Sequence, residues 1–142
     1  MIHLASPGDA ESVRALLREY ADEIGIDLSF QDFDTELADP LAFYDVVLLA
    51  QHGCVAVRRI DGETCEMKRL FVQRAGRGDG LGRALAEAAI AHARARGYDR
   101  MLLDTLPTMH AARALYESLG FSEVEPYREN PVEGTTYLEL QL

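Results

Sequence analysis

The stretch Arg77-Gly78-Asp79-Gly80-Leu81-Gly82-Arg83 decides how the rest of this 142-residue chain is interpreted. It lies between residues 64–72, which follow the Asp61-Gly62 turn and are expected to form a strand, and an alanine-rich segment at residues 81–96, which predicts a long helix. The first N–H groups of a helix lack partners inside the helix, and the helix dipole is positive at that end. A turn without side chains lets such N–H groups close around an anion, so the stretch predicts a phosphate-binding site.

Two other glycine-rich loops do not fit this spacing. The dinucleotide-binding pattern G-x-G-x-x-G fails because Leu81 or Arg83 falls where the third glycine should stand. The nucleotide P-loop needs a lysine and a hydroxyl after its last glycine, whereas Gly82 is followed by Arg83 and Ala84. A turn with a purely structural role is the remaining alternative, although its glycines cost backbone entropy that a plain turn does not require.

Apolar periodicity places further elements on both sides of this turn. Strands are expected at residues 2–5, 46–50, 54–57, 64–72, 98–105, 121–127 and 136–142, and helices at residues 10–23, 33–37, 81–96 and 109–119. Short turns join the strands between residues 46 and 72, which predicts an antiparallel meander. Strand and helix then alternate, which predicts a β-α-β-α unit. We expect an α+β fold in a single domain spanning residues 1–142.

Composition excludes several classes of protein. The chain has 14 basic and 24 acidic residues, and its net charge of -10 disfavours general binding to nucleic acids or anionic membranes. No apolar run approaches the roughly 20 residues that span a bilayer. The only cysteines are Cys54 and Cys65, and no apolar leader follows Met1, so a cytoplasmic protein is expected rather than a secreted disulfide scaffold. The cysteines and histidines show no metal-ligand spacing, so no metal is expected.

The charge is unevenly distributed along the chain. Residues 67–119 hold nine basic and five acidic residues, a net charge of +4, whereas the segments on both sides are acidic. This pattern suits one anionic ligand that docks on the central motif while other anions are repelled. A set of solvated arginines on helix faces would explain the same pattern.

Three motifs together resemble the GNAT N-acetyltransferase superfamily. They are the Arg77-x-x-Gly80-x-Gly82 turn, the preceding Lys68-Arg69-Leu70-Phe71-Val72 strand and the later Ala114-Leu115-Tyr116-Glu117-Ser118-Leu119-Gly120-Phe121 segment. The expected order of elements from residue 2 to residue 142 is similar to that of the family as well. The resemblance implies a mixed, mostly antiparallel central sheet of about six to seven strands flanked by about four helices, with two central strands that splay apart.

The resemblance implies acetyl-CoA as acetyl donor and co-substrate. Its pyrophosphate would bind the backbone amides of Arg77, Gly78, Asp79, Gly80, Leu81, Gly82 and Arg83. Its pantetheine arm would lie along Leu70, Phe71 and Val72, where an N–H near Leu70 or Phe71 could polarise the thioester carbonyl. Met109 and Ala112 are expected beside the coenzyme. Many family members carry Asn where this chain has Met109, so a side-chain amide contact is not expected there.

Amine attack on a thioester needs an uncharged nucleophile and a proton for the departing thiolate. Tyr116 stands where the family has its tyrosine acid, and this role is favoured over that of a core residue of its helix. Glu66 stands where several family members have a general base that acts directly or through water, although an acid near a strand start is often only exposed. Asp104, at the end of the next strand, is the competing carboxylate, with a cap or turn role as its alternative.

The resulting prediction is an enzyme that moves an acetyl group from acetyl-CoA to a primary amine of a small molecule or peptide, by direct attack in a ternary complex. Residues 19–45 contain nine acidic residues and no lysine or arginine, which favours a cationic acceptor but equally fits a solvated acidic face. The alternative is a module that senses acyl-CoA or contacts a partner without catalysis. Dimers are common in the family, so a homodimer is suggested, although no segment identifies an interface.

Overall fold

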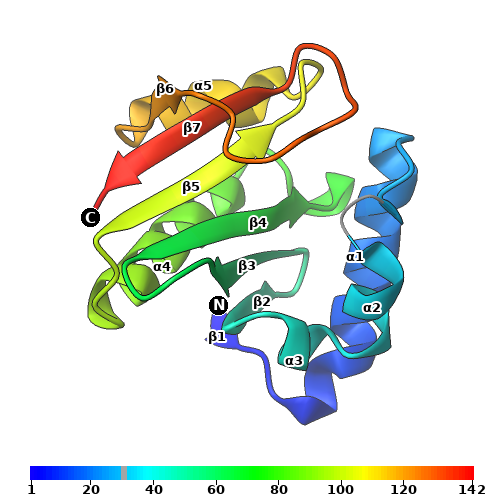
Figure 1. Cartoon of the computed structure of the whole chain (residues 1–142). Helices are drawn as coiled ribbons and strands as arrows, with labels where there is room; N and C mark the ends of the chain where they lie inside the picture. The colour runs from blue at the N-terminus through cyan, green and yellow to red at the C-terminus, as the bar shows by residue number, and fades with distance from the viewer. Residues whose placement is uncertain (30–31) are drawn as a thin grey trace.

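The computed structural model describes residues 1–29 and 32–142. In these residues the chain forms one seven-stranded sheet and five α-helices (Figure 1). The strands are β1 (His3–Leu4), β2 (Val46–Ala50), β3 (Gly53–Arg59), β4 (Thr64–Val72), β5 (Arg100–Thr105), β6 (Ser122–Val124) and β7 (Thr136–Gln141). The helices are α1 (Ala10–Ile24), α2 (Phe33–Ala38), α3 (Pro40–Phe43), α4 (Leu81–Ala95) and α5 (His110–Ser118).

The sheet has the order β1-β2-β3-β4-β5-β7-β6. Of the strand pairs in the described residues, β4–β5 is parallel and the others are antiparallel. The expected meander is formed by β2, β3 and β4, and the parallel crossover from β4 to β5 runs through α4. The predicted α+β fold with a mostly antiparallel sheet is therefore confirmed.

The two central strands stay together only at their beginnings. Strand β4 pairs with β5 over three residues, from Thr64 opposite Arg100 to Glu66 opposite Leu102. Beyond Glu66 the strands diverge, and β5 continues to pair with β7 on its other side as far as Thr105. Figure 1 shows β4 and β5 opening toward the end of the molecule where α1 lies. The predicted splayed pair is confirmed, and it opens the middle of the sheet.

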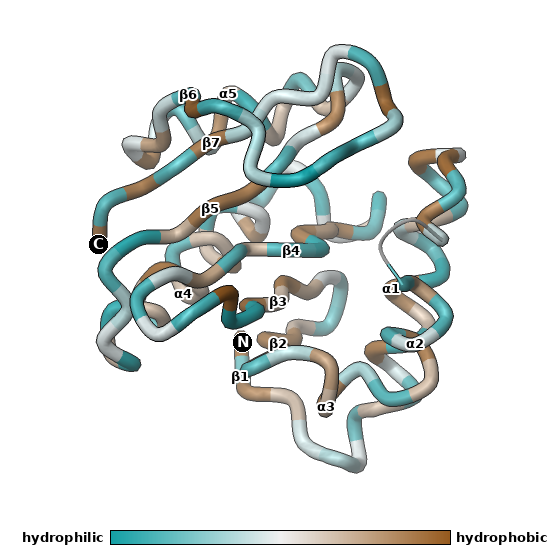
Figure 2. Tube along the Cα trace, in the orientation of Figure 1, coloured by the Kyte–Doolittle hydropathy of each residue, from teal (hydrophilic) through white to brown (hydrophobic). Residues whose placement is uncertain are grey.

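Apolar residues of alternating orientation give the sheet two buried faces. Leu48 and Ala50 of β2 pack in the cluster that contains α4 and α5, whereas Val47 and Leu49 pack in the cluster that contains α1. This alternation follows from the period of two along a strand. Strand β5 is apolar and buried in its middle, at residues 101–103, and polar at its two ends (Figure 2). The two helical layers therefore fix the central strands from both sides.

Some element boundaries differ from those expected. The short helix α3 was not predicted; it begins at Pro40, and Asp39 accepts a bond from the Ala42 amide at 3.2 Å. Strand β5 begins at Arg100 instead of residue 98, because the Tyr98 amide still bonds to the Ala93 carbonyl of α4. Strand β6 ends at Val124 instead of residue 127, just before Pro126, which has no N–H for a sheet.

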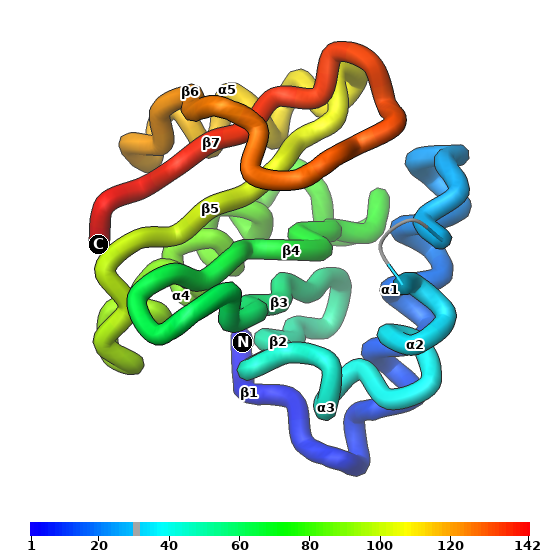
Figure 3. The backbone as a smooth tube through the Cα atoms, viewed as in Figure 1, coloured from blue at the N-terminus to red at the C-terminus, as the bar shows by residue number. Residues whose placement is uncertain are grey.

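The connection between β6 and β7 is important for the site. Figure 3 shows this connection, in orange, passing across the end of β5 on the side of the opening between β4 and β5. It carries Tyr127, Arg128 and Asn130, which contact residues of β4 and β5.

Among the described residues, no helix is long and apolar enough to cross a membrane.

Candidate active site

A bulge in β4 marks the point where the two central strands separate. Cys54 of β3 is opposite Phe71 and Ala56 is opposite Lys68, so Arg69 and Leu70 together face the single residue Val55. Arg69 has φ +59°, a left-handed conformation that costs a non-glycine residue roughly 1–2 kcal/mol. Such bulges bend a strand and take backbone groups out of the ladder. Here the bulge lies at the wall of a cavity.

The cavity lies between the diverging ends of β4 and β5. It is lined by α1 and the residues after it, by residues 67–70 of β4, by the end of β5, by α5 and by Asn130. Four of the predicted site residues meet in its walls, namely Leu70, Met109, Ala112 and Tyr116. The competing carboxylate Asp104 lines it as well. The tertiary structure thus brings together residues from four separate elements.

The glycine turn leads from β4 into α4. Gly78 and Gly80 have φ +94° and +82°, and a Cβ at either position would meet nothing within 4 Å, so backbone conformation is the reason for glycine there. Gly80 is the N-cap of α4, and no side chain caps the helix. Within residues 1–29 and 32–142, no protein group accepts a hydrogen bond from the amides of residues 78–83. These amides suit a phosphate ligand.

The predicted coenzyme arginines have protein partners in this structure. Arg77 donates from Nε to the Val72 carbonyl at 2.8 Å and from Nη2 to Glu23 at 2.5 Å. Arg83 reaches Ser118 of α5 and lies 3.4 Å from Glu87. Their side chains therefore hold the turn against α1 and α5. The Arg77 amide bonds to the Arg74 carbonyl at 3.2 Å, so the amides of residues 78–83 are the groups open to an anion.

In the strand predicted to bind the pantetheine arm, residues 70–72, the backbone is more available to a ligand than the side chains are. The Phe71 ring is buried against α1, edge-on to Tyr20 at 6.0 Å between ring centroids. Val72 is half-buried, and Leu70 lines the cavity. Because β4 has no ladder with β5 beyond Glu66, the backbone edge of residues 70–72 on that side is not used by β5. An extended amide chain could add to this edge.

Tyr116 is buried at the cavity wall. Its side chain comes from α5 and packs edge-on against Phe121, with 5.7 Å between ring centroids. Burial raises the pKa of the Tyr116 phenol, because the charged phenolate is poorly solvated there. The phenol therefore stays protonated at neutral pH, as a hydrogen-bond or proton donor must be.

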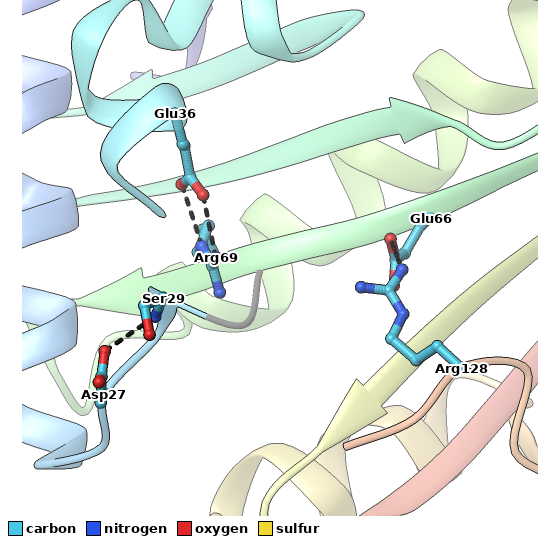
Figure 4. A network of polar contacts seen from close by, with 6 residues as sticks. All are labelled: Asp27, Ser29, Glu36, Glu66, Arg69 and Arg128. Atoms are coloured by element: carbon cyan, nitrogen blue, oxygen red, sulfur yellow. Dashed lines mark hydrogen bonds and ion pairs between the residues drawn. The ribbon is translucent and has the colours of Figure 1, made fainter. Parts of the chain in front are cut away.

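Glu66 lies outside the cavity wall and is fully buried. Its Oε2 accepts a hydrogen bond from the Tyr127 hydroxyl at 2.6 Å, and its Oε1 is 2.5 Å from Arg128 Nη2 (Figure 4). The ring of Tyr127 also lies 5.1 Å from the Arg128 guanidinium carbon. Both carboxylate oxygens of Glu66 are thus engaged by the β6–β7 connection, a partnership that sequence reasoning missed.

Asp104, Lys68 and Arg69 supply the charges at the cavity wall. Asn130 Nδ2 lies 3.4 Å from an Asp104 carboxylate oxygen, so the β6–β7 connection reaches Asp104 as well. Lys68 is the chain's only lysine, and burial lowers its pKa to about 8. Sequence reasoning used Lys68 only as part of a motif. Its position as the chain's one lysine, inside a predicted strand, was the available signal.

The acidic segment is partly engaged within the protein. Glu36 forms a buried ion pair with Arg69, Glu19 accepts from Gln73 at 3.0 Å, and Glu23 pairs with Arg77. Two ion pairs thus link the acidic first part of the sequence with its cationic middle. Among the described residues, no group of three or more His, Cys, Asp or Glu side chains is placed to hold a metal ion.

Comparison with known proteins agrees with this geometry. Residues 10–121 match the Acetyltransferase (GNAT) family. An uncharacterized N-acetyltransferase of Schizosaccharomyces pombe is 40% identical over 147 residues, which cover 96% of this chain and 90% of that protein. This chain covers less than half of the length of three further curated relatives.

Solved structures show the same fold. A GNAT-family acetyltransferase of Staphylococcus aureus has a TM-score of 0.81 at 18% identity, with 99% of this chain and 98% of that chain covered. A GNAT-family acetyltransferase of Elizabethkingia anophelis with acetyl-CoA bound has a TM-score of 0.68 at 21% identity, with 100% and 97% covered. The chain therefore belongs to the GNAT acetyltransferase family. It is an acetyl-CoA-dependent N-acetyltransferase, with acetyl-CoA as its co-substrate.

Proposed function

We propose that this protein transfers the acetyl group of acetyl-CoA to a primary amine of a small molecule or peptide, by direct attack within a ternary complex. The observation that carries the proposal is the set of open amides at residues 78–83, which are separated by five residues from a strand whose free edge leads back to the cavity containing Tyr116. Bound acetyl-CoA would supply the thioester that the amine attacks.

The binding roles follow from the elements. The amides of residues 78–83 would hold the pyrophosphate, since they lie at the positive end of α4, whereas the expected Arg77 amide bonds to the Arg74 carbonyl at 3.2 Å. The edge of residues 70–72 would pair with the pantetheine amides, with Met109 and Ala112 of the opposite wall beside them. An N–H at the β4 bulge, near Leu70 or Phe71, would stabilise the charge that develops on the thioester oxygen.

Tyr116 would give a proton or a hydrogen bond to the departing sulfur, a role supported by its protonated, buried phenol in the cavity wall. Glu66 and Asp104 remain the candidates for the base that takes the proton of the amine. Asp104 lines the cavity, whereas Glu66 would have to act through Tyr127 or water, because both of its oxygens are engaged. The position of Asp104 favours it over Glu66.

The nature of the acceptor stays a prediction. A cationic amine was expected from the acidic segment, but Glu19, Glu23 and Glu36 are engaged within the protein. The cavity wall carries Lys68 as well as Asp104, so an acceptor that bears both an amine and an acidic group deserves equal testing. The single-domain extent, the cytoplasmic location and the homodimer also stay predictions.

The proposal is tested by following thiol release from acetyl-CoA with a panel of polyamines, amino acids, aminoglycosides and peptides. We expect release that depends on one class of amine, with an N-acetylated product in the mass spectrum. Thermal stabilisation by CoA without turnover on any amine would instead support the non-catalytic sensor.

A further inference from the structure

We propose that the buried ion pair between Glu36 and Arg69 is a positioning device for acetyl transfer. The pair would hold the β4 bulge in the backbone conformation that directs an N–H group toward the thioester carbonyl. Glu36 would act through Arg69, and Arg69 through its own backbone, so neither is assigned a chemical step. The inference rests on the proposed function and deepens it.

The geometry of the pair fixes the guanidinium plane. Arg69 Nε lies 3.0 Å from Glu36 Oε2, and Arg69 Nη2 lies 2.9 Å from Glu36 Oε1 (Figure 4). The two side chains are only 3% and 0% exposed. A two-point contact between a guanidinium and a carboxylate defines orientation as well as distance. The Arg69 side chain therefore has one arrangement available.

Further contacts hold Arg69 from other directions. Its guanidinium carbon lies 5.5 Å from the centre of the Tyr20 ring and 5.6 Å from that of Phe33. Its backbone carbonyl accepts a hydrogen bond from the Cys54 thiol at 3.5 Å. The side chain and the main chain of the bulge residue are both anchored, so the bulge resists relaxation into a regular strand.

The backbone conformation at Arg69 needs such support. Its φ of +59° is one that glycine adopts without steric cost, yet the chain carries a long charged residue there. A strained backbone persists only where the surrounding structure over-determines it, and such residues cluster at functional sites. Leu70, the other residue of the bulge, lines the cavity. The strain is thus located where the proposed carbonyl contact would be made.

Helix α2 provides independent support. It has six residues, and Glu36 is its buried residue in the described structure. A glutamate is rarely buried completely unless it is paired. An apolar side chain would attach α2 to the sheet at least as well, because desolvation offsets much of the gain from a buried ion pair. A carboxylate at this point can fix the orientation of the Arg69 side chain, which an apolar residue cannot do.

The test measures the thioester carbonyl directly. The carbonyl stretch of ¹³C-labelled acetyl-CoA is recorded by difference infrared spectroscopy, free and bound, for wild type, Glu36→Gln and Arg69→Lys. The control is Glu139→Gln, which removes the carboxylate of the Arg100–Glu139 ion pair on β5 and β7. We expect a shift to lower frequency in wild type and in the control, and at least half of this shift lost in both test variants. In Glu36→Gln and Arg69→Lys, CoA affinity should change less than about threefold, while kcat falls by at least tenfold.

A second pair of variants separates backbone control from stability. Glu36→Gln/Arg69→Ala and Glu36→Gln/Arg69→Gly both remove the ion pair, but only glycine accepts the positive φ freely. We expect the glycine double variant to retain a kcat about tenfold higher than the alanine variant, since left-handed backbone costs alanine roughly that factor. Equal kcat values in the two, with an unchanged carbonyl shift, would reduce the pair to a stabilising contact.

The two proposals can fail separately. The infrared measurement needs no acceptor, so an amine panel without turnover would contradict the proposed function and leave the carbonyl test intact. Turnover by wild type without any carbonyl shift would overturn the positioning role alone, because there would be no polarisation for the pair to support. Full kcat and full shift in Glu36→Gln and Arg69→Lys would overturn it as well.

Discussion

Tyr116 combines three properties that a proton donor needs: a place in the cavity wall, a buried phenol, and a rigid position on α5 against Phe121. Because burial raises its pKa, the phenol stays neutral over the whole physiological range and beyond the pH at which an exposed tyrosine ionises. The residue that sequence motifs selected thus has the environment that its proposed chemistry requires.

The Tyr116→Phe variant should lower kcat by about a hundredfold, a typical contribution of a general acid. Its affinity for acetyl-CoA, measured by calorimetry, should stay within about threefold, since the ring that packs against Phe121 is kept. Tyr98→Phe is the matched control, because Tyr98 bonds to Asp45 away from the cavity. Equal kcat values for the two variants would remove Tyr116 from the mechanism.

The two carboxylates should respond differently to amidation. Asp104→Asn should lose the rise of kcat/KM with pH, because an amide cannot accept the proton of the amine. Glu66→Gln should keep that rise but lower the free energy of unfolding by about 2 kcal/mol, since it weakens a buried pair with Arg128. Both quantities are measured, by pH–rate profiles and by urea unfolding. The opposite pattern would assign the base to Glu66.

At the scale of elements, the glycine turn and α4 form one functional unit. The helix begins at Leu81 with no capping side chain, and the preceding glycines adopt positive φ. The turn was predictable because glycine spacing and a helix start are local features. The arginine contacts were not, because Glu23 and Ser118 belong to α1 and α5.

The Gly80→Ala variant should weaken CoA binding by about tenfold, because alanine at positive φ displaces the amides that would hold the pyrophosphate. Gly97→Ala is the control at the other end of the same helix. Gly97 has φ +85° with open space around it, so its replacement costs similar backbone energy without touching the turn. Calorimetric titration with CoA checks both variants. A similar loss in Gly97→Ala would mean that helix stability, rather than the turn, controls binding.

The elements themselves were largely predictable, and their ends were not. The continuous apolar run of β2 and the 3.6-residue apolar period of α4 are local features of the sequence. The bulge at Arg69 could not be predicted, because nothing in an Arg-Leu pair demands positive φ. It exists because β3 and β4 meet in a register that leaves two residues opposite one.

At the scale of the whole molecule, the fold places its one lysine inside a wall shared by acidic and basic groups. Burial is the main cause that lowers the Lys68 pKa to about 8, and nearby Glu66 opposes the shift. Between this value and the ordinary pKa of about 10.4, the unfolded chain binds a proton that the folded chain has released. The free energy of unfolding therefore rises with pH across this window.

The pKa of Lys68 can be measured without overlapping signals from other lysines, because the chain has one lysine. Lysine labelled with ¹³C gives the signals of one side chain, and they should titrate near pH 8. Between about pH 8 and about pH 9.5, wild type should gain about 1.5 kcal/mol of unfolding free energy relative to Lys68→Met. Titration near the ordinary lysine value, with parallel stability curves, would contradict the burial of the charged group.

The sequence alone determined the order of the strands and of every helix except α3, the meander, the glycine turn before α4 and the motif tyrosine. Each of these depends on residues close together in the chain, through periodicity, turn chemistry and helix-end amides. Only the tertiary structure decided which charges meet: Glu36 with Arg69 across 33 residues, and Glu66 with Arg128 across 62. Such pairs depend on how the helical layers pack on the sheet and on where β4 separates from β5. No local sequence pattern encodes a contact between residues so far apart in the chain.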